Sequence, residues 1–244
     1  MSFLIKKFRL FSPNGLIHGY STRLGGVSST PYDSLNLGKN TNDNPADVDK
    51  NRSIFFNALN IDISRCVFPQ QVHSDVVVTV DRPGIVEKCD ALITREKNLF
   101  LTIQTADCFP IFLYDNLNEI VAIVHSGWRG TAKNIVKKTI KQMAANPLHI
   151  RAAIGPGVQQ SCYQVDEKTA AHFNRKYLIP DGNTHFKLDI QDAIYDQIIA
   201  AGVIRENIAT DTSCTHCRSD LYYSYRRDGE NSGRMMSVIG MCDR

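Results

Sequence analysis

Two apolar runs constrain the fold of this chain most strongly, because each run leads directly into residues that carry chemistry. Leu99 to Gln104 leads into Asp107 and Cys108, and Ile120 to Val124 leads into His125. Short apolar runs bounded by polar residues are typical of buried β-strands. A thiol and an imidazole thus follow two buried strands, and this placement favours a chemical role over a packing role.

Strand and helix patterns follow one another along the whole chain, so the sequence predicts an α/β (α+β) fold. Strand segments are predicted within residues 1–13 and over residues 76–80, 120–124, 221–226 and 235–241. Helices are predicted from about Asp47, Thr131 and Asp189, a turn at 12–15 and a loop at 180–187. No linker or repeat interrupts the pattern, and we expect a single domain over residues 1–244.

Composition limits the classes of function. A formal charge of +3 is too small to indicate a nucleic acid or a membrane surface as partner. Lys6, Lys7 and Arg9 interrupt the apolar N-terminus, so no signal peptide is predicted. The seven cysteines are an odd number without disulfide-framework spacing. Reduced thiols in the cytoplasm are the simplest expectation.

A third candidate ligand joins Cys108 and His125. His73 stands just before the predicted strand at 76–80. Two imidazoles and one thiolate, with a fourth position open, are donors suited to a catalytic zinc site. Only the fold can bring residues so far apart together. A buried cysteine and hydrogen-bonded histidines in the core are therefore the alternative interpretation.

The same residues also permit a mechanism without a metal. Cys108 would act as a thiolate nucleophile and His125 as its base, with Asp107 orienting a partner or transferring a proton. This arrangement suits amide or acyl chemistry. The residues alone do not decide between the two interpretations.

Two further segments are candidates for anion binding or metal binding. Arg129 precedes a predicted helix whose first N–H groups are unpaired, which predicts an anion pocket beside His125. Arg23, followed by paired glycines, is another anion candidate. The segment 214–217 (Cys-Thr-His-Cys) contains the only C-x-x-C, and one such pair is a weak signal for zinc or redox chemistry.

Several motifs together resemble those of the laccase-domain (YfiH-like) family, also called polyphenol oxidase. They span nearly the whole chain and comprise residues 18–23, 25–28, 34–38, 51–52, 71–74, 90–94, 105–108, 125–130, 154–156, 223–227 and 233–234. The Thr-Ala-Asp-Cys block ending at Cys108 and the His-Ser-Gly-Trp-Arg-Gly block beginning at His125 are the most specific.

The resemblance implies a layered α/β/β/α sandwich with mixed sheets and a zinc ion bound by His73, Cys108 and His125, with copper as the less favoured metal. It implies a purine nucleoside phosphorylase acting on adenosine, inosine, guanosine and methylthioadenosine, with adenosine deaminase activity. Its partners would be a small-molecule purine nucleoside and phosphate. Arg129, with Arg23 or Asn36, would bind the phosphate, and Asp107 would transfer a proton.

Two other functions are consistent with the same family. One is a metal-independent Cys-His amidohydrolase that edits peptidoglycan precursors. The other is a copper-dependent polyphenol oxidase (laccase). One cysteine and two histidines form at most one copper site, whereas coupled oxygen reduction generally needs several, which disfavours the oxidase.

Overall fold

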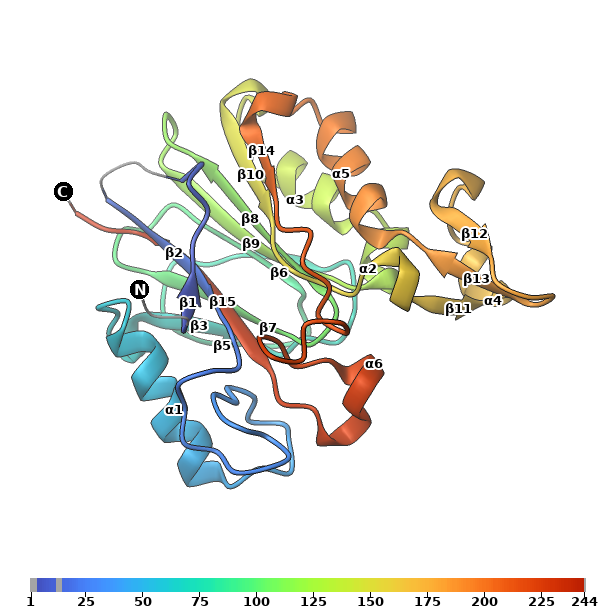
Figure 1. Ribbon diagram of the computed structural model, residues 1–244. Helices are drawn as coiled ribbons and strands as arrows, with labels where there is room; N and C mark the ends of the chain where they lie inside the picture. The colour runs from blue at the N-terminus through green and yellow to red at the C-terminus, as the bar shows by residue number, and fades with distance from the viewer. Residues whose placement is uncertain (1–3, 12–14, 244) are drawn as a thin grey trace.

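The fold consists of two mixed β-sheets packed face to face, with helices on both outer faces (Figure 1). The computed structural model describes residues 4–11 and 15–243. The α/β class and the α/β/β/α order of layers predicted for the chain are confirmed. The turn predicted at residues 12–15 lies mostly outside the described residues.

The first sheet is built around the last strand of the chain. Its strands, in spatial order, are β1 (Ile5–Lys6), β2 (Leu16–Ser21), β15 (Met235–Met241), β7 (Phe100–Thr105), β3 (Cys66–Pro69) and β5 (Gly84–Val86). β15 pairs antiparallel with both β2 and β7, while β3 runs parallel to β7. The C-terminal strand therefore joins the N-terminal strands to the middle of the chain.

The second sheet contains the two strands that lead to the candidate site. Its strands, in spatial order, are β14 (Ile208–Thr210), β10 (Ile150–Ile154), β8 (Phe109–Asp115), β9 (Ile120–Ser126), β6 (Ala91–Thr94) and β4 (Val77–Thr79). β8 and β9 form an antiparallel hairpin in which Pro110 pairs with His125. All residues of both strands are buried, because the sheet is covered on both faces.

The alternation of side chains along β9 assigns its residues to two separate cores. Ala122 and Val124 pack with the helices on the outer face. Val121 and Ile123 pack between the two sheets, against residues such as Leu101. Successive side chains of a strand point to opposite faces, so His125 belongs to the side that faces the first sheet.

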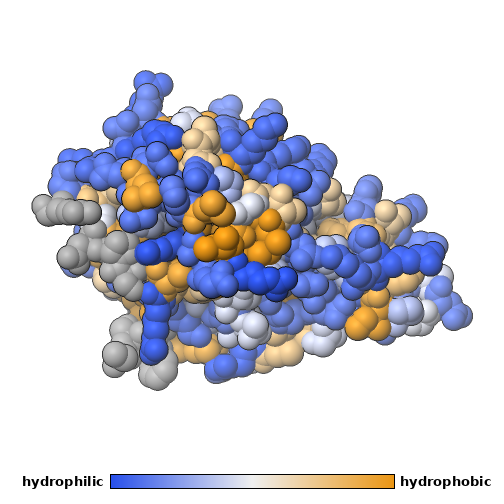
Figure 2. Space-filling model, turned by 90° about the horizontal axis from the view of Figure 1, so that it is seen from above, coloured by the Kyte–Doolittle hydropathy of each residue, from blue (hydrophilic) through white to orange (hydrophobic). Residues whose placement is uncertain are grey.

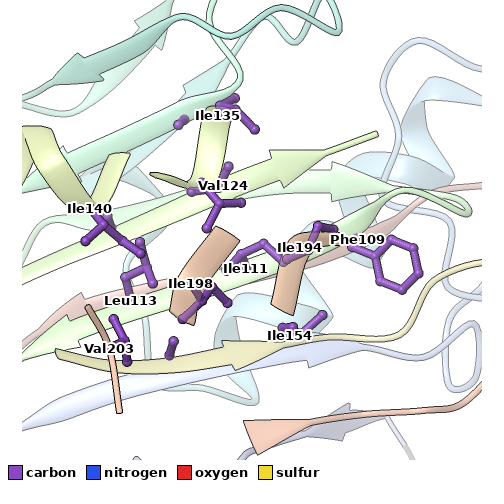
Figure 3. Close-up of a cluster of buried hydrophobic side chains, with 14 of the residues drawn as sticks. Phe109, Ile111, Leu113, Val124, Ile135, Ile140, Ile154, Ile194, Ile198 and Val203 are labelled. Atoms are coloured by element: carbon purple, nitrogen blue, oxygen red, sulfur yellow. The ribbon is translucent and has the colours of Figure 1, made fainter. Parts of the chain in front are cut away.

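The helices cover the outer faces through apolar stripes. α1 (Pro45–Asn57) packs Phe55 and Phe56 against the first sheet. α3 (Ile135–Gln142) and α5 (Ile190–Ala200) cover the second sheet, and Figure 3 shows their isoleucines among side chains of β8, β9 and β10. Burying one such side chain stabilises the fold by roughly 1.5–3 kcal/mol before conformational entropy is counted.

Three shorter helices and a small sheet complete the chain. The helices are α2 (Trp128–Ala132), α4 (Glu167–Ala170) and α6 (Tyr225–Asp228). The sheet contains β11 (Gln164–Asp166), β13 (His185–Leu188) and β12 (Leu178–Pro180), and it extends from the body at the right of Figure 1. Single 3-10 turns occupy Ile63–Arg65, Pro147–His149, Gln160–Cys162, Arg175–Tyr177, Arg205–Asn207 and Gly229–Asn231.

Three predictions of local structure differ from the structure. The predicted loop at 180–187 contains most of β13, whose strand pairing with β11 and β12 arises from tertiary contacts. The predicted strand at 221–226 is a turn followed by α6, because Ser224 Oγ caps that helix by accepting the Arg227 N–H at 3.2 Å. The predicted helix from Thr131 is divided into α2 and α3 at Asn134, whose backbone is left-handed.

The face of the molecule drawn in Figure 2 is mostly hydrophilic. Figure 2 shows one face on which hydrophobic residues gather in a small central patch within hydrophilic surroundings. The exposed large hydrophobic residues come from separate loops, 3-10 turns, short strands and α6: Ile63, Val72, Val76, Ile85, Leu117, Leu148, Ile179, Ile204 and Tyr225. Among the residues that the structure describes, no helix is both long and apolar enough to cross a membrane.

Candidate metal centre

The structure brings together three residues that are far apart in sequence. The ligand atoms of His73, Cys108 and His125 all lie within 4.8 Å of one another. The two imidazole rings meet edge to face, with centroids 4.9 Å apart. Two imidazoles and one thiol therefore converge at one point, as the metal-site interpretation of the sequence requires.

Cys108 stands where the chain passes from one sheet to the other. It follows β7 of the first sheet and immediately precedes β8 of the second. The hairpin places Gly127 opposite Cys108, and a Cβ on Gly127 would lie 2.7 Å from Cys108 Sγ. A glycine is therefore required at this position for the thiol to occupy its place.

Asp90 connects the two histidines and was not among the predicted site residues. It is fully buried at the start of β6, and its Oδ1 lies 2.8 Å from His125 Nδ1. Its other oxygen accepts hydrogen bonds from Ser74 N–H and Ser74 Oγ, both at 2.6 Å. One carboxylate thus orients the His125 ring and holds the loop that carries His73.

The hydrogen bond that His125 donates to Asp90 determines which of its nitrogens can face a ligand. The carboxylate accepts the Nδ1 hydrogen, so Nε2 is the nitrogen left to face Cys108 or a metal ion. Burial by itself raises the pKa of the Asp90 carboxyl, but hydrogen bonds from His125 and Ser74 outweigh burial and lower the pKa to about 2. Asp90 is therefore ionised across the physiological pH range.

His73 is held in an unusual backbone conformation. Its φ is +57°, in the left-handed region that costs a residue with a Cβ roughly 1–2 kcal/mol. Asp90 Oδ1 accepts the His73 N–H at 3.1 Å. Gln71 exchanges two hydrogen bonds of 2.8 Å with the backbone of Gln104 in β7. The His73 loop is thus fixed to both sheets, and such fixed strain is frequent at functional sites.

Cys108 and His125 form an electrostatically coupled pair. Burial raises the pKa of the Cys108 thiol, but the neighbouring His125 and His73 outweigh it and bring the pKa below the ordinary thiol value. Burial lowers the pKa of His125, but the Cys108 thiolate and Asp90 outweigh it and raise the pKa. The thiolate is therefore favoured, which suits both a metal ligand and a nucleophile.

Asp107 binds the C-terminal part of the chain. Its backbone has a φ of +88°, and its buried carboxylate accepts the Thr215 hydroxyl at 2.7 Å and the Arg226 N–H at 2.6 Å. The residue next to Cys108 is therefore an anchor for the 214–217 loop and for α6. Its proton-transfer role stays a prediction.

Arg129 stands at the edge of the site, in the first turn of the short helix α2, which begins at Trp128 rather than at the predicted Thr131. Arg129 lies within the one-turn helix α2, exposed, with its guanidinium 4.4 Å from the Trp128 ring centroid. α3, the longer helix, begins after the left-handed Asn134. The helix beside Arg129 is thus shorter than predicted, and the anion pocket at its N-terminus stays a prediction.

Tyr163 and Arg226 extend this edge; Tyr163 was not predicted as a site residue, whereas Arg226 lies in the family motif at 223–227. The Arg226 guanidinium lies 5.0 Å from the centroid of the Tyr163 ring. Burial and the Cys108 thiolate raise the pKa of Tyr163, while Arg226 and Arg129 act in the opposite direction. The phenol therefore lies within electrostatic reach of the thiol and of both guanidinium groups.

Two residues predicted to contact phosphate, Asn36 and Arg23, form hydrogen bonds with other residues of the chain instead. The Asn36 amide donates to Thr41 and Asp43, and its oxygen accepts the N–H groups of Gly38 and Arg234. These four bonds use every donor and acceptor position of the side chain. Asn36 is also fully buried, so its interactions are structural ones.

The Arg23 guanidinium is similarly engaged. It donates to the Asp33 carbonyl at 2.8 Å and to the Ser219 carbonyl at 3.1 Å, and it pairs with the Asp33 carboxylate at 3.2 Å. It also lies over the ring of Tyr223, 4.8 Å from its centroid. The anion-binding role predicted for Arg23 therefore has no support in its contacts.

Together these features define a layered α/β protein with an open Cys-His-His ligand set where its two sheets meet. The chain belongs to the multi-copper polyphenol oxidoreductase laccase family, whose sequence model matches residues 17–242. This membership confirms the family predicted from the motifs.

Curated relatives and a solved structure agree with this assignment. The chain is 34% identical over 246 residues to purine nucleoside phosphorylase YlmD from Bacillus subtilis (strain 168), with 93% of this chain and 88% of that protein covered. It is 32% identical over 246 residues to adenosine deaminase RL5 from an unknown prokaryotic organism, with 91% and 93% covered. The crystal structure of hypothetical protein YfiH from Bacillus licheniformis matches with a TM-score of 0.90 at 31% identity, covering 96% of this chain and 98% of that one. The predicted class of enzyme agrees with the names of these relatives.

Proposed function

We propose that the chain is a zinc-dependent purine nucleoside phosphorylase that also deaminates adenosine. The observation that carries this proposal is the convergence of His73, Cys108 and His125 within 4.8 Å, with Asp90 orienting His125. Relatives named for both activities cover more than nine tenths of this chain. Adenosine, inosine, guanosine and methylthioadenosine are the proposed nucleosides, with phosphate as the second substrate.

The donor set fits Zn²⁺. Catalytic zinc sites combine three protein ligands with one open position, and imidazole nitrogen and thiolate are both zinc ligands. His125 Nε2 is free to coordinate because Nδ1 is bound to Asp90. When bound, zinc supplies Lewis acidity and lowers the pKa of water toward about 7. Copper is the alternative metal that the family's description suggests, and metal analysis of the purified protein distinguishes the two.

The arginines at the edge of the site are suited to phosphate. Arg129 and Arg226 are exposed, and both influence the phenol of Tyr163 beside Cys108. Guanidinium groups bind phosphate oxygens with charge-assisted, often paired hydrogen bonds. We assign phosphate binding to Arg129 and Arg226, whereas Arg23 and Asn36 have their polar groups engaged in the fold.

Phosphorolysis requires a phosphate oxygen, held by these arginines, to lie next to ribose C1′. A phosphate oxygen attacks ribose C1′, the bond from C1′ to purine N9 breaks, and its electron pair leaves with the purine, which takes up a proton. Asp107 is the proposed group for proton transfer because it adjoins Cys108 and is held by Thr215 and Arg226. In deamination, water attacks purine C6 and ammonia leaves.

The test is a product analysis. Zinc-loaded protein is incubated with adenosine, with and without phosphate, and the products are separated by chromatography. We expect adenine and ribose 1-phosphate with phosphate, and inosine without it. Cys108→Ala should abolish all products, whereas the matched change Cys242→Ala at another partly buried free thiol should keep them. Absence of all three products from the zinc-loaded wild type would contradict the proposal.

One observation favours a second candidate, a metal-independent Cys-His amidohydrolase. Cys108 is favoured as the thiolate by His125, as a nucleophile–base pair requires. Such an enzyme keeps its activity after chelation and loses it on alkylation of Cys108. The zinc-dependent enzyme instead loses activity on chelation and recovers it when Zn²⁺ is returned.

We also propose that residues 1–244 form one domain located in the cytoplasm. Support for one domain comes from β15, which pairs with strands from both the N-terminal and the middle parts of the chain. Support for the location comes from the seven cysteines, all of which are free thiols.

A further inference from the structure

A second group of thiol and imidazole side chains lies outside the His73 site. The ligand atoms of Cys162, His216 and Cys217 all lie within 4.8 Å of one another. Cys162 Sγ and Cys217 Sγ are 3.3 Å apart, well beyond the roughly 2.05 Å of a disulfide bond, so both are thiols. Cys214 is the first residue of the same C-x-x-C segment and adjoins this group of three without belonging to it.

Two chain segments form this group and are fixed to each other. Cys162 ends the 3-10 turn Gln160–Cys162, whereas the other three residues come from the 214–217 loop. Gly157 and Cys214 form an isolated parallel β-bridge, and Thr215 N–H donates to the Gly157 carbonyl at 3.1 Å. The fold thus brings a distant third cysteine to the C-x-x-C segment, and the spacing along the sequence does not reveal it.

Cys214 is held in place beside this group. Its sulfur accepts the Gln159 N–H at 3.4 Å, and a hydrogen-bond donor to sulfur favours the anionic form that binds metals. Arg227 holds the same loop, since its Nη1 donates to the carbonyls of Thr215 and His216 at 2.9 and 3.0 Å while its Nη2 pairs with Asp228.

We propose that Cys162, Cys214, His216 and Cys217 bind one structural Zn²⁺ ion. Three cysteines and one histidine form a closed set of four protein ligands, which is the composition of structural zinc sites. Cys217 is exposed, so an ion can reach the ligands from solvent. The proposal is independent of the activity assigned to the His73 site.

A zinc ion in this group would also affect the His73 site, because Thr215 connects the two sites. Thr215 lies between two of the ligands in sequence, and its hydroxyl donates to Asp107 Oδ1 at 2.7 Å. Asp107 precedes Cys108, and its carbonyl also accepts the Val158 N–H at 2.9 Å. Val158 and Thr215, which both donate hydrogen bonds to Asp107, belong to the two segments that the zinc ion would join. The ion would therefore help to fix the backbone at Asp107 and Cys108.

X-ray absorption spectroscopy of zinc-loaded wild-type protein tests the ligand set without any substitution. With both sites filled, one site supplies one sulfur and the other three, so zinc has on average about two sulfur ligands at about 2.3 Å. With only the His73 site filled, the average is about one sulfur. The second result would overturn the proposal.

Variants that lack one of the two sites allow zinc binding at the other site to be measured alone. In His73→Ala/Cys108→Ala protein, which lacks the first site, we expect about one zinc per chain after dialysis, with about three sulfur ligands. Adding Cys162→Ser and Cys217→Ser should remove this zinc, whereas adding Cys242→Ser in their place should leave it bound. Co²⁺ serves as a spectroscopic probe of the same site. The His73→Ala/Cys108→Ala protein, with or without Cys242→Ser, should show thiolate charge-transfer absorption. The protein that also carries Cys162→Ser and Cys217→Ser should not.

Two outcomes would contradict the second site. One is a folded His73→Ala/Cys108→Ala protein, verified by circular dichroism, that holds no zinc. The other is wild type purified under reducing conditions whose intact mass and peptide map show a Cys162–Cys217 disulfide, since that bond uses two of the proposed ligands. Either result in folded protein shows that the cluster does not bind a metal.

Discussion

Asp90 Oδ1 lies 2.8 Å from His125 Nδ1, and the same carboxylate accepts the backbone N–H groups of His73 and Ser74. One buried side chain thereby determines the orientation of one candidate ligand and the backbone position of another. The geometry of the Cys-His-His site consequently depends on a residue that would not itself contact the metal.

Replacing Asp90 by asparagine tests this dependence. Asn cannot offer a second acceptor oxygen to Ser74, and it removes the negative charge beside His125. Loss of such a partner of a ligating histidine typically lowers metal affinity about 10–100-fold. Competition with a chromophoric chelator measures the zinc affinity. Asp81→Asn, at an exposed position, is the control, and equal affinities in both variants would contradict the orienting role.

Gly127→Ala tests the contact between the hairpin and the thiol. The backbone of Gly127 (φ −88°) accommodates alanine, so the effect comes from the new Cβ, 2.7 Å from Cys108 Sγ. We expect the thiol to be displaced, and a misplacement of about 1 Å can reduce a rate about a hundredfold. Steady-state kinetics with adenosine and phosphate measure the effect.

Gly182→Ala is the companion variant for this test. Gly182 has a φ of +82° and open space around its Cα, so alanine strains the backbone there without touching the site. We expect lower stability with unchanged activity. A Gly127→Ala protein with wild-type activity would contradict the requirement for a glycine opposite Cys108.

The thiol of Cys108 should be reactive at lower pH than an ordinary cysteine in the metal-free protein. Burial opposes ionisation, but His125 and His73 bring the pKa of Cys108 below its usual value. The thiolate is the reactive form, so alkylation by iodoacetamide should reach its plateau below the pH expected for a free thiol of pKa about 8.5. Peptide mass spectrometry follows the reaction at Cys108.

Two comparisons make this prediction specific. His125→Gln should move the alkylation midpoint to higher pH, because the main stabilising neighbour is lost. Zn²⁺ should protect Cys108 from alkylation if the thiolate is a ligand. A midpoint equal to that of a free thiol in wild type would contradict the coupling of Cys108 to His125.

His18 should contribute to unfolding at acid pH. Burial lowers the pKa of His18 to about 4, with Lys7 acting in the same direction, so the folded chain holds the ring neutral. The unfolded ring has a pKa of about 6.5, so falling pH protonates it and favours unfolding. At pH 5 this costs about 2 kcal/mol of the free energy of unfolding.

Urea unfolding of wild type and His18→Gln at pH 7 and pH 5 measures the effect. The variant loses the hydrogen bond that Phe8 N–H donates to His18 Nε2 at 2.9 Å, so we expect it to be less stable at both pH values. The loss of stability between pH 7 and pH 5 should nevertheless be smaller in the variant. Equal losses in both proteins would contradict the assignment.

Local signals in the sequence predicted much of the fold. The strand at 235–241 corresponds to β15, and the predicted cap Asp189 accepts the Asp192 N–H at the start of α5. Where prediction failed, tertiary contacts decided the structure. Residues 221–226 have a strand-like composition, yet Ser224 and the contact between Asp107 and the Arg226 N–H begin a helix there.

The three ligands of the candidate site were predictable as residue types at the ends of strands, whereas their partners were not. Asp90 begins the family motif at 90–94, but the motif does not show its role, because its hydrogen bonds exist only when β6, β9 and the His73 loop are adjacent. Cys162 likewise joins the 214–217 loop only in the folded chain. Asn36 is the opposite case. It was predicted to bind phosphate, but all its side-chain hydrogen bonds are to other residues of the chain.

Anomalous diffraction at the zinc absorption edge, from crystals grown with Zn²⁺, locates the metal ion itself. We expect a peak within bonding distance, about 2.0–2.3 Å, of His73, Cys108 and His125, and its loss in crystals of Cys108→Ala protein. A zinc-dependent, active wild-type protein whose crystals show no anomalous peak among these three side chains would contradict this expectation.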